Sequence, residues 1–206
     1  MSGIIAQNTL DNSGLIKSPA GGGAWNFIKK LTASGDADLS FVDGTDDVVL
    51  DDTYKEYVFT FNNIHPETDG AAFTVGFRDG GSAYDATKTT TYFFAQHNEA
   101  DDLAQITYRT GDDLAQSTSF QGIYNNGLGA DNDQSVSGTL HLYNPSSTTF
   151  VKHFLCEAQG SLDGDVSLVV YVAGYCNVTA AIDGVQFKMA SDNIDAGDIC
   201  LYGITT

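Results

Sequence analysis

Residues 52–69, DTYKEYVFTFNNIHPETD, carry the strongest alternating pattern in the chain. Tyr57, Phe59 and Phe61 fall on one side of an extended chain, because successive side chains of a strand point to opposite faces. The residues between them are less aromatic and fall on the other side. The stretch therefore predicts a β-strand with an aromatic core face, at the centre of one sheet.

We expect this strand to end in a turn over residues 62–66. Pro66 cannot donate to a β-ladder, and it restricts the preceding residue to extended geometry. Residues 72–78 then alternate again, with apolar side chains on one face. Two alternating segments separated by Pro, Asp and Gly suggest a hairpin or adjacent strands.

The rest of the chain contains short alternating or apolar segments at residues 25–32, 39–42, 89–97, 106–109, 136–142, 150–156, 166–175, 185–189 and 199–204. Residues 166–175 (VSLVVYVAGY) are nearly all apolar, which predicts a central strand packed on both faces. Residues 111–116 could form one helical turn, and 125–133 have the composition of a loop. Roughly ten to twelve strands with almost no helical signal predict an all-β fold, an antiparallel β-sandwich of jelly-roll type.

The first 23 residues differ from the rest of the chain. They end in SPAGGG, a flexible linker. We therefore divide the chain into an N-terminal arm and linker, 1–23, and a sandwich domain, 24–206. The arm is either a frayed terminus or an attachment to a partner subunit, and its apolar residues are Ile4, Ile5, Leu10, Leu15 and Ile16.

The domain opens with an aromatic segment. In an unbroken strand Trp25, Phe27 and Leu31 share a face, with Lys29 among them. This pattern predicts a half-buried edge strand, protected by lysine from pairing with other chains.

The chain is strongly acidic, with 27 Asp and Glu against 9 Lys and Arg and a net charge of −18. Such a surface repels phosphate backbones and anionic membranes, so we expect neither a nucleic-acid nor a membrane partner. No stretch reaches membrane-spanning length, and the start lacks the pattern of a secretory signal. We expect synthesis in a cytoplasm, with Cys156, Cys176 and Cys200 as reduced thiols.

The sequence contains no recognisable catalytic arrangement. A nucleophile needs an oriented base beside it, but no G-x-S-x-G elbow occurs and the four histidines are scattered. His141 and His153 fall in adjacent strands and should face outward; a zinc pair is the alternative, with Cys156 on the opposite face. Paired acids are common, yet a glycosidase needs two of them across a cleft, which spacing cannot show. We expect no enzyme activity.

Two acidic loops suggest a cation site. Alternate oxygen ligands in loops suit Ca²⁺, although ordinary turn chemistry also explains them. We expect no cofactor, with calcium as the alternative, held by Asp131, Asp133, Asp163 and Asp165.

Tyrosines predicted at loops or strand ends could contact a glycan, because sugar rings stack on aromatic faces. Aromatic residues are needed first for the core of a sandwich. The candidates for glycan contact are Tyr84, Tyr92, Tyr108, Tyr124 and Tyr143.

Five motifs together resemble a family of small virion structural proteins of tailed bacteriophages, many of them marine or cyanobacterial. In chain order they are WNFIKKLTAS, DTYKEYVFTFNNIHPETDGAAF, DLAQSTSFQ, ADNDQSVSGTLHLYNPSSTTFVKHF and YVAGYCNVTAAIDGVQFKMASDNIDAGDICLYGI, and the resemblance covers about residues 24–204. The resemblance implies a β-sandwich decoration, fibre or tail-appendage module without catalytic residues. The resemblance does not account for the arm or the three cysteines.

This resemblance implies a subunit made in the host bacterial cytoplasm and displayed on the virion surface. Its partners would be capsid or tail proteins of the same virion, reached through the arm, and analogy with phage appendages suggests a homotrimer. The alternative is a tail adhesin that binds a host surface glycan or receptor. A depolymerising enzyme is a third hypothesis, which requires two apposed acids in a cleft.

Overall fold

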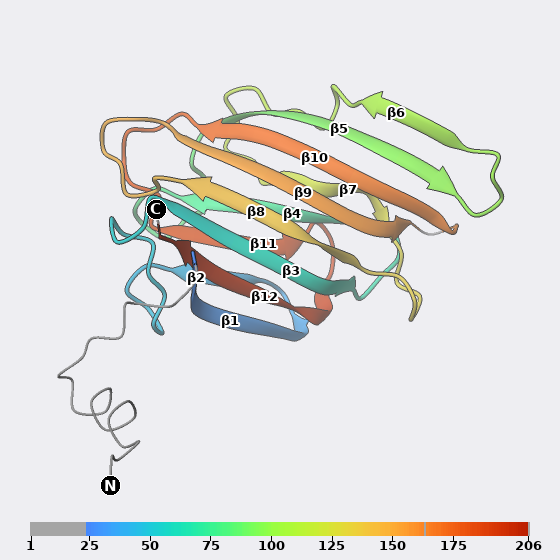
Figure 1. Ribbon diagram of the computed structural model, residues 1–206, viewed down its shortest axis with the longest axis horizontal. Coiled ribbons are helices and arrows are strands. Elements are labelled where there is room, and N and C mark those ends of the chain that lie inside the picture. Colours follow the sequence, from blue (N-terminus) through green and yellow to red (C-terminus); the bar gives the residue numbers. More distant parts are fainter. Residues whose placement is uncertain (1–23, 163, 206) are drawn as a thin grey trace, which may run out of the picture.

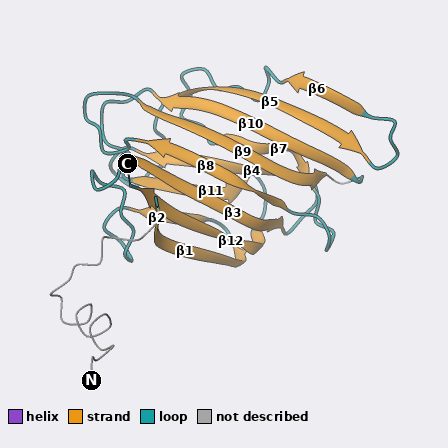
Figure 2. Cartoon of the chain, in the orientation of Figure 1, coloured by secondary structure: helices purple, strands orange, loops and turns teal. Residues whose placement is uncertain are grey.

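The computed structural model describes residues 24–162 and 164–205. This part of the chain contains strands and loops but no helix (Figure 2). The all-β prediction is therefore confirmed. The strands are β1 (Trp25–Asp36), β2 (Leu39–Val42), β3 (Glu56–Pro66), β4 (Ala71–Arg78), β5 (Lys88–Asn98), β6 (Ala104–Tyr108), β7 (Gln121–Leu128), β8 (Val136–Tyr143), β9 (Lys152–Leu162), β10 (Val166–Cys176), β11 (Gly184–Met189) and β12 (Ile194–Ile204).

The strands form two layers, which we call the large sheet and the small sheet (Figure 1). The large sheet has the order β1-β12-β3-β8-β9-β10-β5-β6, and the small sheet has the order β7-β4-β11-β2. Neighbouring strands are antiparallel throughout both layers. The layers join along one side, where Leu128 of β7 pairs with Leu162 of β9.

The path of the chain is that of a jelly roll. It passes between the sheets from β1 to β2, then to β3 and β4, and later from β7 to β8 and from β11 to β12. Four strands of the large sheet, in the order β1-β12-β3-β8, therefore correspond one by one to the four strands of the small sheet, in the order β2-β11-β4-β7. The pairs β5-β6 and β9-β10 extend the large sheet on one side, so the predicted jelly-roll sandwich is confirmed.

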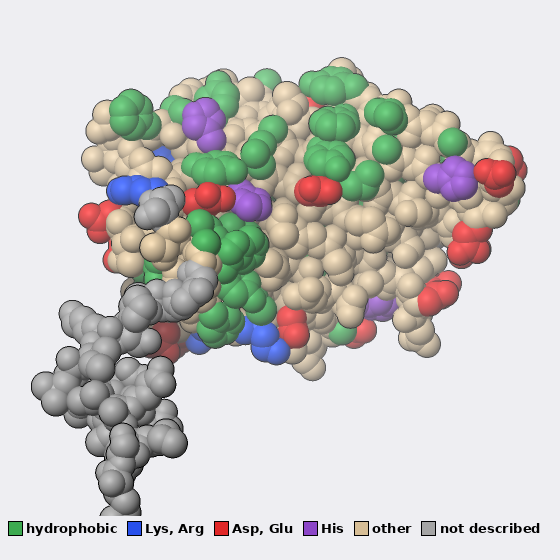
Figure 3. All heavy atoms as spheres, in the orientation of Figure 1, with side chains coloured by type: hydrophobic (Ala, Val, Ile, Leu, Met, Phe, Trp, Pro, Cys, Tyr) green, Lys and Arg blue, Asp and Glu red, His purple; other side chains and the backbone are tan. Residues whose placement is uncertain are grey.

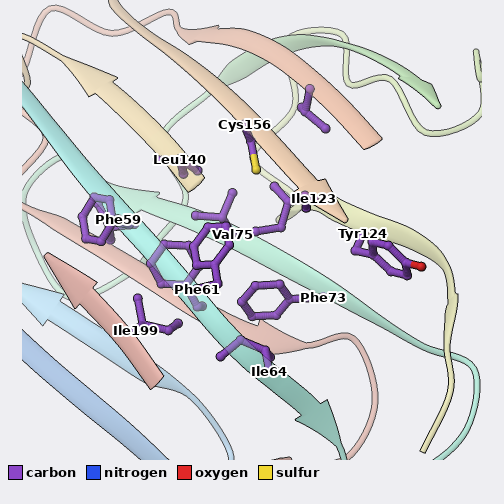
Figure 4. Packing of buried hydrophobic residues seen from close by; sticks show 14 of the residues in the cluster. Phe59, Phe61, Ile64, Phe73, Val75, Ile123, Tyr124, Leu140, Cys156 and Ile199 are labelled. Carbon is purple, nitrogen blue, oxygen red and sulfur yellow. The ribbon is translucent and has the colours of Figure 1, made fainter. Parts of the chain in front are cut away.

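An aromatic cluster fills the space between the sheets (Figure 4). Tyr57, Phe59 and Phe61 of β3 are at most 1% exposed, as the alternation predicted. β3 lies inside the large sheet between β12 and β8. Phe187 of β11 faces it from the small sheet, with ring centroids 5.3 Å from those of both Phe59 and Phe61. The central position expected for this strand is confirmed.

Two predictions near β3 are wrong. The expected turn over 62–66 is a break in pairing within a strand that continues to Pro66. Asn63 adopts a positive φ of 51°, which returns Ile64 to the core with no exposed surface. The expected hairpin with 72–78 is absent as well, because β4 pairs with β7 and β11 in the small sheet.

Three other local predictions need correction. Residues 111–116 form turns and bends without a helical turn. Residues 125–128, which were expected in a loop, belong to β7, and Leu128 is buried in the core. β1 is the edge strand that was expected, but a bulge between Phe27 and Lys29 reverses the alternation. Phe27 therefore points to solvent and is 61% exposed, whereas Leu31 packs against the core, so the prediction that the two share a face is wrong.

Strand β10 is covered on only one face. Leu168, Val170 and Val172 point into the core and are buried. Tyr171, between them, lies on the outer face of the large sheet and is 38% exposed. The prediction that 166–175 packs on both faces is therefore wrong for the single chain, and an apolar outer face remains open.

Two lysines and a cysteine form an inward-facing row at one end of β5, β10 and β9. Cys176 lies opposite Lys88 on one side and Lys152 on the other, and all three are fully buried. The Lys88 ammonium donates to the Ser119 carbonyl at 2.7 Å. That of Lys152 donates to three carbonyls, those of Ser147, Phe150 and Val178. Burial lowers the pKa of both lysines.

Alkaline pH is expected to destabilise the protein. Burial raises the pKa of Tyr92 and of Cys176 to about 12. The unfolded chain therefore loses these protons first, from about pH 9 upward, and the free energy of unfolding falls as the pH rises toward 12. Burial raises the pKa of three further groups in the same way, those of Tyr57, Tyr124 and Cys156.

The two buried lysines act in the opposite direction, because the unfolded chain holds their protons longer as the pH rises. Two lysines therefore oppose five buried groups, the three tyrosines and two cysteines whose pKa is raised. We expect a lower urea midpoint at pH 10.5 than at pH 8, measured by equilibrium unfolding. An equal or higher midpoint at pH 10.5 would contradict the burial of these hydroxyl and thiol groups.

Candidate functional site

The outer face of the large sheet is the most distinctive surface of the described chain. Apolar side chains gather over its strands, whereas acidic ones lie mainly toward the rim (Figure 3). Phe93 of β5 is 42% exposed, and Leu155 of β9 is 50% exposed. Both alternate with inward-facing neighbours, so the strand period itself places them outside.

This face contains two adjoining hollows over β8, β9, β10 and β5, which together we call the outer groove. The first has a volume of about 360 Å³ and is lined by Phe93, Thr139, His141, Leu155, Glu157 and Tyr171, among others. The second has a volume of about 380 Å³ and is lined by Thr89, Thr91, His153 and Tyr175, among others. Tyr143, Leu155 and Ala173 line both hollows, so the two lie next to each other.

A fixed aromatic pair forms one wall of the groove. Phe93 and Tyr171 are direct partners in the β5–β10 ladder, and their rings stack at 5.1 Å with an interplanar angle of 14°. The Tyr171 hydroxyl donates a hydrogen bond to the Glu157 carboxylate at 3.0 Å. This bond raises the pKa of Tyr171 and holds its ring in place.

Histidines contribute the opposite wall. His141 Nδ1 lies 2.6 Å from Glu56 Oε1 on the neighbouring strand β3. The His141 ring also stacks on Tyr143, with centroids 6.3 Å apart. In the second hollow His153 packs against Tyr175 at 6.1 Å. The groove therefore combines aromatic faces with hydroxyl, imidazole and carboxylate groups.

The lining of the groove is nearly free of charge. Glu157 is the one carboxylate among the residues lining the two hollows, and none of those residues is Lys or Arg. The chain as a whole carries a net charge of −18. The groove is thus a region of low charge density, with one carboxylate, on a strongly acidic protein.

The tyrosines predicted to contact glycan divide into three groups. Tyr143 lines the groove. Tyr108 of β6 is 54% exposed and pairs with Phe93 of β5. Tyr84 is half-buried beside Gly184 of the small sheet, away from the groove. The prediction is wrong for Tyr92 and Tyr124, because both side chains are fully buried between the sheets.

Sequence reasoning missed Phe93, Leu155 and Tyr171, which the structure brings together in the groove. The signal was present, since each is a large apolar residue at an outward position of an alternating strand. Assigning 166–175 to a strand packed on both faces concealed it.

The histidine and cysteine predictions are confirmed. His141 and His153 lie on adjacent strands and face outward, whereas Cys156 points into the core. Within residues 24–162 and 164–205 no cluster of three or more potential metal ligands occurs. All three cysteines are unpaired and buried, and burial raises the pKa of Cys156 and Cys176, which makes both poor nucleophiles.

The calcium prediction is only partly covered by the described residues. Asp133 and Asp165 line a common hollow of about 310 Å³ at one end of the large sheet, together with Glu99. Asp131 belongs to the same loop as Asp133 but does not line this hollow, and Asp163 lies outside the described residues. The calcium site stays a prediction, and comparing melting temperatures in calcium and in chelator would test it.

Two further features concern the ends and surfaces of the chain. The predicted attachment residues Ile4, Ile5, Leu10, Leu15 and Ile16 lie outside the described residues. Among the residues that the structure describes, no helix is long and apolar enough to cross a membrane.

Comparison with known proteins gives no assignment. No protein-family model matches the sequence, and no curated protein matches it. The resemblance to phage virion proteins therefore stays a prediction from the motifs, and the class defined by the structure is that of all-β jelly-roll proteins.

Proposed function

We propose that this protein is a non-enzymatic structural subunit of a tailed-phage virion, displayed on the particle as a decoration or appendage module. The observation that carries the proposal is a closely paired jelly roll with one aromatic face of low charge on an otherwise acidic surface. Long antiparallel ladders provide a rigid scaffold, and the groove provides a surface for recognition. The five ordered sequence motifs support the same assignment.

The position of the described N-terminal end suits attachment through residues 1–23. Ala24 is the first residue that the structure describes, and it lies immediately before edge strand β1. The outer groove lies over β8, β9, β10 and β5, farther across the large sheet. A subunit held at its N-terminal end would therefore leave the groove free to face water.

The expected result for purified particles is the presence of this chain in many copies. Quantitative mass spectrometry of virions purified by density gradient, with the major capsid protein as internal reference, measures the copy number. Absence of the chain from intact particles that retain the other structural proteins would contradict the proposal.

A second candidate function is receptor binding by a tail adhesin, and the outer groove specifically favours it. The stacked Phe93 and Tyr171 rings, surrounded by hydrogen-bonding groups, form a surface suited to a ligand. Competition by the purified protein for phage adsorption to host cells tests this function. Unchanged adsorption at saturating protein would count against it.

A further inference from the structure

We propose that the outer groove binds an uncharged oligosaccharide, with sugar rings seated in both hollows. This inference rests on the recognition role proposed for the groove and specifies the class of ligand. It depends on the shape of the groove, its pattern of aromatic and polar groups, and its charge.

The shape favours an elongated ligand. The two hollows adjoin and share three lining residues, Tyr143, Leu155 and Ala173. A ligand that fills both must extend along the strands, because the first hollow lies at the paired residues Phe93 and Tyr171 and the second at Thr89 and Tyr175 of the same two strands. A chain of linked rings fits this form, with one or more rings in each hollow.

The chemistry of the lining matches a sugar ring, which presents C–H groups on its faces and hydroxyl groups at its edges. The exposed rings of Phe93 and Tyr171 and the side chain of Leu155 offer apolar contact for the faces. Thr139, His141 and Glu157 surround them with groups that donate or accept hydrogen bonds.

The Glu157 carboxylate is already oriented. One of its oxygens accepts from the Tyr171 hydroxyl, and further acceptor capacity remains for a ligand hydroxyl. The same bond fixes the aromatic wall, so binding requires little reordering of these two side chains.

Charge distinguishes between classes of saccharide. Acidic sugars are usually bound by cationic side chains, and neither hollow is lined by Lys or Arg. A net charge of −18 also repels an anionic polymer from the surface. Neutral hexoses or N-acetylhexosamines avoid both costs.

A second copy of the chain fits the same face less well. A two-fold interface requires a self-complementary surface, and two facing grooves would enclose an empty or wet space. Polar groups such as Thr139 and His141 would also need partners in the buried interface. The concave form therefore favours a ligand that enters it.

The first experiment uses the full-length protein on an array of neutral oligosaccharides, built from glucose, galactose, mannose and N-acetylhexosamines, alongside sialylated and uronic-acid oligosaccharides. We expect binding among the neutral probes and none among the anionic ones. The best probe is then titrated by calorimetry. Binding confined to anionic probes, or to none, would overturn the proposal.

Variants locate the site. Phe93→Ala and Tyr171→Ala should each weaken binding of the best neutral probe about tenfold or more, because each removes an aromatic contact surface. Phe27→Ala is the matched control, since Phe27 is an exposed ring on the same face of the large sheet but belongs to β1. Equal affinity of all three variants and the wild type would place the ligand elsewhere.

Separate measurements distinguish the possible failures. Urea unfolding of each variant shows whether lost binding reflects lost structure, and Tyr171→Phe, which retains the ring, should keep more affinity than Tyr171→Ala. Sedimentation that shows association abolished by Phe93→Ala, without binding of any saccharide, would assign the face to a second copy and overturn the inference. Absence of the chain from virions would instead contradict the proposed function.

Discussion

Phe187→Ala is expected to lower the free energy of unfolding by about 3–5 kcal/mol. Phe187 lies at the centre of the aromatic cluster, with centroid distances of 5.3 Å to both Phe59 and Phe61 and 5.9 Å to Phe73. It also meets the Phe41 ring edge-on at 6.3 Å. Truncation would leave a cavity between the two sheets that these stiff rings cannot close. Urea unfolding followed by circular dichroism measures the loss.

Phe27→Ala provides the control for this prediction, because the Phe27 ring is 61% exposed. Its loss should change the free energy of unfolding by less than about 0.5 kcal/mol. Phe59→Ala, on the facing strand, should again cost about 3–5 kcal/mol. A loss below about 1 kcal/mol for both Phe187→Ala and Phe59→Ala would mean that the cluster does not hold the sheets together.

Gly138→Ala is expected to destabilise the protein by about 3 kcal/mol, a large effect for a single methyl group. A Cβ at this position of β8 would lie 2.7 Å from the Cα of Ala158 and even closer to the carbonyl oxygen of Glu157. Both obstacles are backbone atoms of the adjacent strand β9, so no side-chain rotation relieves the clash. The two strands would have to separate beneath the outer groove.

Gly111→Ala is the matched control, because a Cβ there meets nothing within 4 Å and the residue does not have a positive φ. Its stability should change by less than about 1 kcal/mol. Thermal unfolding of the two variants in parallel gives the comparison. Equal melting temperatures would show that β8 and β9 are farther apart than the structure indicates.

Much of the fold could be predicted from the sequence where one face of a strand is buried. Alternation then identifies both the strand and its inward side, as it did for Tyr57, Phe59 and Phe61. The number of short strand-like segments, with almost no helical signal, indicated an antiparallel sandwich. Turn-forming residues gave most of the strand ends.

Other features depend on tertiary context and could not be predicted. The bulge after Phe27 and the irregular pairing near Asn63 each reverse the alternation of a strand. The local sequence does not indicate either of them. Placement of β4 in the small sheet depends on its pairing with β7 and β11. Hydrophobic periodicity indicates which face of a strand is buried, but it does not identify the strand that pairs with it.

The candidate site shows the same limit. Tyr143 was identified because a tyrosine at a strand end suits sugar contact. Tyr92 and Tyr124 were chosen on the same ground, but they are core residues. Phe93 and Tyr171 come together only because β5 and β10 pair in one particular register. Residue type therefore suggested the chemistry, and strand register determined which residues carry it.

A cryo-EM map of the purified virion tests the central claim most directly. We expect many copies of the twelve-stranded jelly roll on the particle surface, with the Ala24 end directed toward the particle and the outer groove open to solvent. Particles without this density would contradict the account. So would particles in which the outer groove is sealed against a capsid protein or a second copy of the chain.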